Sequence, residues 1–123
     1  QQQLLKSLRF QPATVILGPR PVGKTTIAKT IAKKLKKKSL YLDLENPGDL
    51  MKMSDGFTYL QAHSDKCVII DEVQQQPQLF GWLRPLIDAN RKSGRFLLLG
   101  SANPALVRGA SETPPMVREL RAA

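Results

Sequence analysis

Short apolar runs alternate with amphipathic stretches along this chain. The runs at residues 13–17, 66–72 and 95–100 have the composition of strands that are buried in a parallel sheet. A fourth stretch, residues 39–44, alternates polar and apolar side chains as a strand does, and a turn signal at residues 45–48 ends it. The pattern therefore predicts four strands.

Apolar residues at helical spacing occupy the segments around these strands. They predict helices over residues 2–8, 26–32 and 79–90, while mixed periodicity at residues 49–62 indicates short helical turns. A further short helix is expected at residues 104–108, because a proline stands at its first position. Strands that alternate with helices are typical of an α/β fold.

A phosphate-loop pattern lies between the first strand and the helix that follows it. Two glycines five residues apart precede Lys and Thr. In this context successive backbone N–H groups and the positive end of the helix point at one place, where a triphosphate fits. Lys24 brings a charge to the outer phosphates, and Thr25 offers a hydroxyl to Mg²⁺. The candidate binding residues are Gly18, Pro19, Arg20, Pro21, Val22, Gly23, Lys24, Thr25 and Thr26.

The alternative interpretation of this loop is a glycine-rich turn with an incidental surface lysine. It explains neither the flanking strand and helix nor the acidic motif downstream, so phosphate binding is favoured.

Two carboxylates, Asp71 and Glu72, end the apolar run at residues 66–72. In open α/β sheets, ligands bind at the carboxyl ends of strands. We therefore expect Asp71 to face Mg²⁺ beside Thr25, and Glu72 to act on the water that attacks the γ-phosphate. The alternative is a strand end capped by solvated acids, and the phosphate loop earlier in the chain disfavours it.

Ser101 and Asn103 follow the strand predicted at residues 95–100. A polar side chain just past a central strand lies near the γ-phosphate if that strand adjoins the phosphate-loop strand, and it can then orient the attacking water. Asn103 can also cap the helix at residues 104–108. Both roles can hold together.

Size and composition limit the class of protein. The 123 residues are one domain's worth, and the chain is expected to be a piece of a longer protein because it begins without Met. No apolar run approaches the ~20 residues that span a membrane. The single cysteine, Cys67, excludes an internal disulfide, suits a reducing compartment and is expected to fill the core. A cytoplasmic protein is expected.

The formal charge of +9 and the pI near 10.1 raise the question of a nucleic-acid partner. Much of the excess lies at residues 33–38, at the end of a predicted helix, where cations favour the negative end of the helix dipole. No aromatic residues interleave these lysines to stack on bases. A solvated helix end is favoured, and DNA stays open as a partner.

These motifs resemble one family, the prokaryotic AAA-type ATPases whose N-terminal AAA domain precedes a C-terminal domain of unknown function. The resemblance covers nearly the whole chain and rests on residues 18–26, 41–45, 68–74, 98–103 and 106–109. It implies that residues 1–123 form a single AAA-type ATP-binding domain. The implied fold is a three-layer P-loop NTPase fold with a mostly parallel central sheet, of the catalytic-glutamate class.

The resemblance also implies roles for the candidate residues. Lys24 and Thr25 match Walker A, Asp71 and Glu72 match Walker B, and Asn103 or Ser101 matches the sensor 1 position. It implies binding of ATP and ADP with Mg²⁺, and hydrolysis coupled to an attached C-terminal domain or a protein partner. The oligomeric state stays open, with a homo-oligomer among the expectations.

Two departures from the family pattern stand out. Pro21 takes a position where these ATPases commonly carry Gln, which stiffens the loop and removes one N–H, although binding is expected to survive. Ser111-Glu112 runs directly into Thr113-Pro114, where a loop and a fifth strand are expected. The fifth strand is thus expected to be absent, either because the sequence closes over an omitted segment or because the strand is deleted. Omission is favoured, since a lost strand would expose a backbone edge, and no arginine finger can be assigned.

Two other classes of function compete with an ATPase. A small-molecule phosphotransferase would need an arginine-bearing lid and an acceptor pocket, and the sequence indicates neither. A nucleotide-dependent DNA-binding or scaffolding module with slow turnover would use the basic surface, and its affinity would fall steeply with salt.

Overall fold

The structure, a computed structural model, describes residues 2–17, 26, 29–30, 33–34, 38–100 and 117–121. In chain order, its elements are α1 (Gln2–Phe10), β1 (Ala13–Leu17), β2 (Ser39–Asp43), α3 (Pro47–Lys52), α4 (Gly56–Ala62), β3 (Cys67–Asp71), the 3-10 helix η1 (Val73–Gln75), α5 (Leu79–Ala89), β4 (Phe96–Gly100) and β5 (Val117–Arg121).

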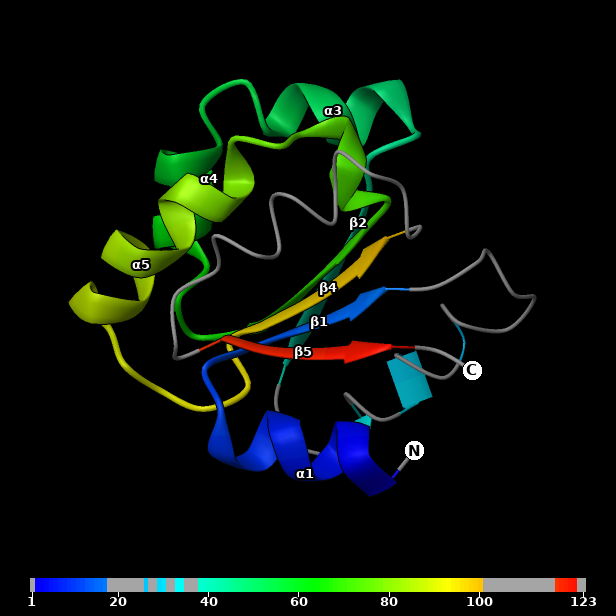
Figure 1. Ribbon diagram of the computed structural model, residues 1–123. Helices are drawn as coiled ribbons and strands as arrows, with labels where there is room; N and C mark the ends of the chain where they lie inside the picture. Colours follow the sequence, from blue (N-terminus) through cyan, green and yellow to red (C-terminus); the bar gives the residue numbers. More distant parts are fainter. Residues whose placement is uncertain are drawn as a thin grey trace.

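Five parallel strands form one sheet in the order β2-β3-β4-β1-β5 (Figure 1). The four strands predicted from the apolar pattern are all present, and their ends differ from the prediction by at most one residue. β4, which comes late in the chain, lies between β1 and β3. The sheet therefore brings together three strand ends that are far apart in the sequence.

The expectation of a missing fifth strand is wrong. β5 pairs in parallel with β1 along its whole length, from Ala13 opposite Val117 to Leu17 opposite Arg121. The segment Val-Arg-Glu-Leu-Arg has only two apolar residues, so it lacks the continuous apolar run that marks a strand buried inside a parallel sheet. β5 supplies the hydrogen-bonding partner that the backbone edge of β1 requires.

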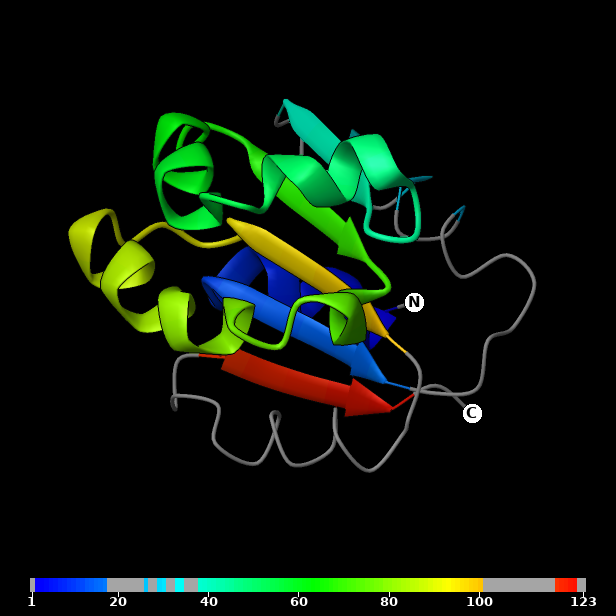
Figure 2. The same cartoon turned by 90° about the horizontal axis from the view of Figure 1, so that it is seen from above.

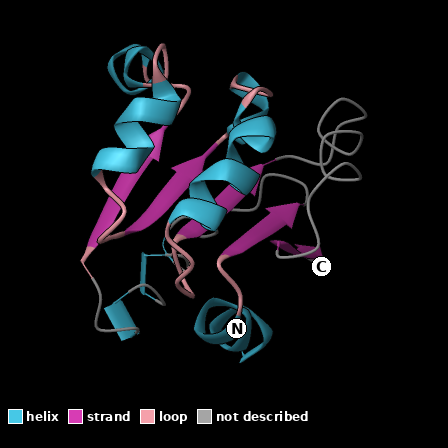
Figure 3. Ribbon diagram, turned by 90° about the vertical axis from the view of Figure 1, so that its left-hand side faces the viewer, coloured by secondary structure: helices cyan, strands magenta, loops and turns pink. Residues whose placement is uncertain are grey.

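Helices cover both faces of the sheet, with α1 on one face and α3, α4 and α5 on the other (Figure 1, Figure 3). The larger cluster of buried apolar residues, on the α3–α5 face, includes Val15, Leu42, Leu60, Ile70, Leu79, Leu83, Ile87 and Leu98. The smaller cluster, on the α1 face, consists of Leu8, Cys67, Ile69, Leu97 and Leu99. Alternate residues of each buried strand enter different clusters, which gives the expected three layers.

The helices that flank the sheet largely follow the predicted pattern. Residues 49–62 fall into the short helices α3 and α4, and Gly56 at the start of α4 lies against Trp82 of α5, where a Cβ would approach the indole to 2.4 Å. Of the helix predicted at residues 26–32, residues 26, 29 and 30 are described and are helical. The helix predicted at residues 104–108 lies outside the described residues.

Candidate functional site

The carboxyl ends of β1, β4 and β3 lie side by side at one edge of the sheet, where their arrowheads point the same way (Figure 2). Leu17, the last residue of β1, pairs with Gly100, the last residue of β4, and Asp71 ends β3. The phosphate-loop sequence begins at residue 18. The topology thus brings Leu17, Gly100 and Asp71, with Glu72 after it, to the same edge.

Asp71 is a buried carboxylate that accepts hydrogen bonds on both oxygens. Its side chain is almost fully enclosed, with 7% of the residue exposed. The hydroxyl of Tyr41 donates to Oδ2 over 2.8 Å, and the N–H of Glu72 donates to Oδ1 over 2.9 Å. Two donors on two different oxygens restrict rotation of the carboxylate, so Asp71 is held in one orientation.

Glu72 stands at a sharp change of chain direction. Its backbone is left-handed, with φ 59° and ψ 49°, and it is the one non-glycine residue with positive φ in the described ranges. A side chain as large as Glu is disfavoured in this conformation, and such strain is concentrated at functional sites. Only 6% of Glu72 is exposed, and the amide nitrogen of Gln74, in η1, donates to its Oε2.

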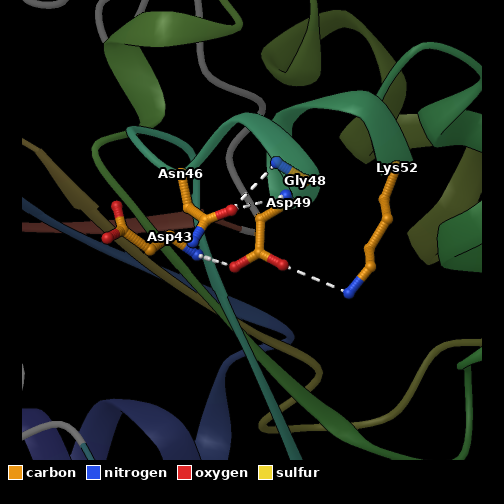
Figure 4. Close-up of polar contacts among 5 residues, drawn as sticks. All are labelled: Asp43, Asn46, Gly48, Asp49 and Lys52. Atoms are coloured by element: carbon orange, nitrogen blue, oxygen red, sulfur yellow. Dashed lines mark hydrogen bonds and ion pairs between the residues drawn. The ribbon is translucent and has the colours of Figure 1, made fainter.

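The turn after β2 builds the neighbouring part of this edge (Figure 4). The carboxylate of Asp49 accepts the N–H of Asp43 over 2.9 Å and pairs with Lys52 at 3.1 Å. Asn46 caps α3 by accepting the N–H groups of Gly48 and Asp49. The hydrogen bond from the Asp43 backbone, helped by Lys52 and opposed by burial, lowers the pKa of Asp49. Because Asp43 pairs with Asp71 across the strands, this turn fixes the chain beside the acidic pair.

Only part of the sequence-predicted site falls within the described residues. Asp71 and Glu72 are adjacent and buried at the carboxyl edge, and Thr26 is helical and exposed. The other candidates lie outside the described residues: Gly18, Pro19, Arg20, Pro21, Val22, Gly23, Lys24, Thr25, Ser101 and Asn103.

The sequence interpretation gave no role to Tyr41 or Gln74, two side chains that donate hydrogen bonds to the acidic pair. Tyr41 stands two residues before Asp43, so knowledge of the β2–β3 register would have placed it on the same face as Asp71. Gln74 comes two residues after Glu72. This spacing would place the two side chains on one face of a strand, but it predicts no contact where the chain has already left the strand. The Tyr41 contact depends on strand pairing, and the Gln74 contact depends on the backbone turn at Glu72.

Comparison with known proteins identifies a family. A family model described as an AAA domain matches residues 10–119, which is most of the chain. The chain belongs to this AAA domain family. The AAA domain has similar stretches in Uncharacterized protein Rv2008c of Mycobacterium tuberculosis and Uncharacterized protein Mb2031c of Mycobacterium bovis. Each is 39% identical over 111 residues, which are 90% of this chain and 24% of the relative. The AAA domain therefore spans less than a third of the length of these relatives.

A solved structure supports the same fold. The AAA domain is similar to the P-loop NTPase domain of the sigma-54 transport activator from E. coli, with a TM-score of 0.57, 14% identity and 91% of each chain covered. Likeness at this identity shows the fold alone, so the AAA domain has the P-loop NTPase fold, which is a nucleotide-binding fold. None of its described helices is long and apolar enough to cross a membrane.

Proposed function

We propose that this AAA domain binds ATP with Mg²⁺ and hydrolyses it. The observation that carries the proposal is the buried pair Asp71 and Glu72 at the carboxyl end of β3, which β4 separates from β1. The phosphate-loop sequence begins directly after β1. Ligands of open α/β sheets bind at this edge. Burying two acids costs folding free energy, so their retention at a ligand-binding edge supports a role in binding a cation or in a reaction.

The donor set of the site fits Mg²⁺. Carboxylate and hydroxyl oxygens are hard ligands, and Mg²⁺ commonly takes one or two carboxylates together with substrate phosphates. Within the described ranges no three His, Cys, Asp or Glu residues form a metal-binding group, so the proposal assigns the remaining ligands to Thr25 and the nucleotide. When bound, Mg²⁺ neutralises charge that develops on the phosphates.

Under this proposal, different residues bind the phosphates, the cation and the attacking water. Residues 18–26 bind the phosphates, with Lys24 as the charged group, and Asp71 holds the cation. Glu72 accepts a proton from the attacking water, and Ser101 or Asn103 orients that water. We further propose that turnover drives a change in an attached domain or protein partner, since the relatives extend well beyond this domain.

Substitution of Glu72 tests the proposal most directly. Glu72→Gln keeps the shape and the hydrogen bond from Gln74 but removes the base, so ATP binding is expected to persist while turnover falls about 100-fold or more. Lys24→Ala is expected to lose ATP binding. Binding is measured with a fluorescent ATP analogue, and turnover by phosphate release.

Asp55→Asn is the matched control, because Asp55 is exposed at the start of α4 and its loss should leave turnover unchanged. Equal turnover in wild type and Glu72→Gln would contradict the proposal. ATP binding without turnover in the wild type would instead favour a nucleotide-dependent binding or scaffolding module.

A further inference from the structure

Tyr41 connects three elements at the candidate site. Its ring is half-buried and packs against the smaller core cluster on the α1 face of the sheet. Its hydroxyl reaches Asp71 at the end of β3, and the ammonium of Lys29 lies 4.1 Å from the centre of its ring. Lys29 belongs to the helical residues that follow the phosphate-loop sequence. One side chain of β2 thus contacts both the acid proposed to hold the cation and the segment after the loop proposed to hold the phosphates.

The β2–β3 register explains how Tyr41 reaches Asp71. Asp43 pairs with Asp71 and Tyr41 pairs with Ile69, so Tyr41 and Asp71 project from the same face of the sheet, one step apart along neighbouring strands. This diagonal separation is within reach of a long aromatic side chain. The core packing of the ring fixes where the hydroxyl lies, because a tyrosine ring has few rotatable bonds.

The chemistry of the donor suits a carboxylate that must bind a cation. A phenol hydroxyl orients a carboxylate through one hydrogen bond and leaves its negative charge intact, whereas an Arg or Lys partner would neutralise that charge. Groups that hydrogen-bond to metal ligands orient them, and their loss commonly weakens metal affinity about 10- to 100-fold. The cation of Lys29 over the ring face stabilises the ring in place.

We infer that Tyr41 is the positioning residue for Asp71, holding its carboxylate for a divalent cation bound with the nucleotide, and that Lys29 links this arrangement to the helix after the phosphate loop. The inference rests on the proposed function, since it assumes that a cation and a nucleotide occupy this edge.

Tyr41→Phe is the deciding variant, because it removes one hydroxyl and keeps the ring, its packing and the Lys29 contact. In the intact protein, Mn²⁺ affinity is measured by electron paramagnetic resonance in the presence of a non-hydrolysable ATP analogue. The variant is expected to need about ten-fold more Mn²⁺ for half-saturation, while its affinity for the analogue in excess chelator stays as in wild type. The same shift is expected in the Mg²⁺ dependence of turnover.

Tyr59→Phe is the matched control. Tyr59 is also half-buried but lies in α4, on the other face of the sheet, with its ring 4.7 Å from that of His63. It should leave the Mn²⁺ half-saturation unchanged. In an Asp71→Asn background, Tyr41→Phe should add nothing, because the carboxylate that it positions is gone.

Lys29→Met tests the link to the helix without disturbing the core, since Lys29 is exposed, and about a two-fold weaker Mn²⁺ affinity is expected. An unchanged Mn²⁺ half-saturation in Lys29→Met would show that Lys29 does not connect Asp71 to the helix. An unchanged half-saturation in Tyr41→Phe, with a wild type that binds Mn²⁺ and nucleotide together, would overturn the positioning role alone. A wild type without cation-dependent nucleotide binding would overturn the proposed function and this inference with it.

Discussion

Both edges of the sheet bury charge, but they bury it in different ways. At the carboxyl edge, Asp71 and Glu72 are 7% and 6% exposed. At the amino edge, Arg95 immediately precedes β4 and is 2% exposed. Burial alone therefore does not distinguish a functional site from a structural one in this molecule, and the partners of each charge have to be compared.

The partners of Arg95 are main-chain carbonyls at the end of a helix. Its Nη1 donates to the carbonyl oxygens of Leu86 and Asn90, at the C-terminal end of α5, where helix carbonyls lack partners and the dipole is negative. The main-chain N–H of Arg95 donates to the carbonyl oxygen of Pro12. Burial lowers the pKa of the Arg95 guanidinium, which nonetheless stays charged. Arg95 joins α5 to the sheet through these main-chain carbonyls, while its Nε is buried without a hydrogen bond in the described part of the chain.

The acidic pair receives hydrogen bonds from side chains that are themselves neutral. Tyr41 donates to Asp71, and Gln74 donates to Glu72. These two donors orient the carboxylates and carry no charge of their own. The comparison indicates that removing the buried charge at the amino edge should cost stability, whereas disturbing the partners at the carboxyl edge should cost turnover.

The largest effect on stability is expected from Arg95→Met. Met fills similar space but leaves two carbonyls at the end of α5 without a donor, so the free energy of unfolding should fall by about 3 kcal/mol. This corresponds to a fall in Tm of roughly 10 °C. Urea denaturation followed by circular dichroism measures it, and ATP affinity below the transition should stay as in wild type.

Arg91→Met is the control for Arg95→Met, because Arg91 is exposed in the same connection between α5 and β4 and its loss should change stability by less than about 0.5 kcal/mol. If Arg95→Met kept its Tm but lost ATP turnover, the assignment of the amino edge to structure would be wrong.

Gln74→Met should have the opposite effects, with turnover reduced and stability largely kept. The amide oxygen Oε1 of Gln74 is buried and makes no hydrogen bond within the described part of the chain, which is a cost for folding. An apolar side chain of similar length removes this cost together with the donor to Glu72. The relief of the unsatisfied oxygen and the loss of the donor to Glu72 oppose each other, so the Tm should change little. Meanwhile kcat should fall about ten-fold because the base is less well held, with little change in KM.

Gln75→Met controls for that substitution, since Gln75 is the next residue of η1 and is exposed. Should Gln74→Met keep the wild-type kcat, the hydrogen bond to Glu72 would be structural and the contrast between the two edges would weaken.

The sequence predicted the central strands well because strands buried on both faces must be apolar along their length. The runs that became β1, β3 and β4 have this composition. β5 pairs with β1 alone and is polar at three of its five positions, so nothing in its composition separated it from a loop. Its place in the sheet follows from pairing with β1, which is a long-range contact.

The acidic pair was predicted for a similar reason, since polar residues directly after a buried strand must lie at its carboxyl end. The residues that contact the pair were not predictable. The Tyr41 contact depends on the register between β2 and β3, and the Gln74 contact depends on the left-handed turn at Glu72. Arg95 was included in a predicted strand, and its hydrogen bonds to α5 depend on how that helix packs. Composition and spacing contain no information of this kind.

The smallest effect is expected from Asp49→Asn in the turn beside the acidic pair. This variant tests whether the turn contributes to stability alone or also to turnover. The pKa of Asp49 is lowered in the folded protein below its ordinary value of 3.8, chiefly by the Asp43 N–H. A carboxylate whose pKa is lower in the folded than in the unfolded protein stabilises the fold at pH values above its unfolded pKa. This stabilisation is lost as the pH falls through the pKa of the folded state. Asn retains an acceptor for the Asp43 N–H, so at pH 7 the variant should lose only about 0.5 kcal/mol of unfolding free energy.

The difference between wild type and Asp49→Asn should shrink as the pH drops below 3.8 and vanish once Asp49 is protonated in the folded state. Urea denaturation at pH 7 and at a series of acid pH values measures it. Asp88→Asn, at an exposed position of α5 that pairs with Arg84 at 3.7 Å, is the control for loss of a surface ion pair away from this turn. Turnover at pH 7 should match wild type in both variants. A loss of turnover in Asp49→Asn without a change in stability would make the turn after β2 part of the chemistry at the carboxyl edge.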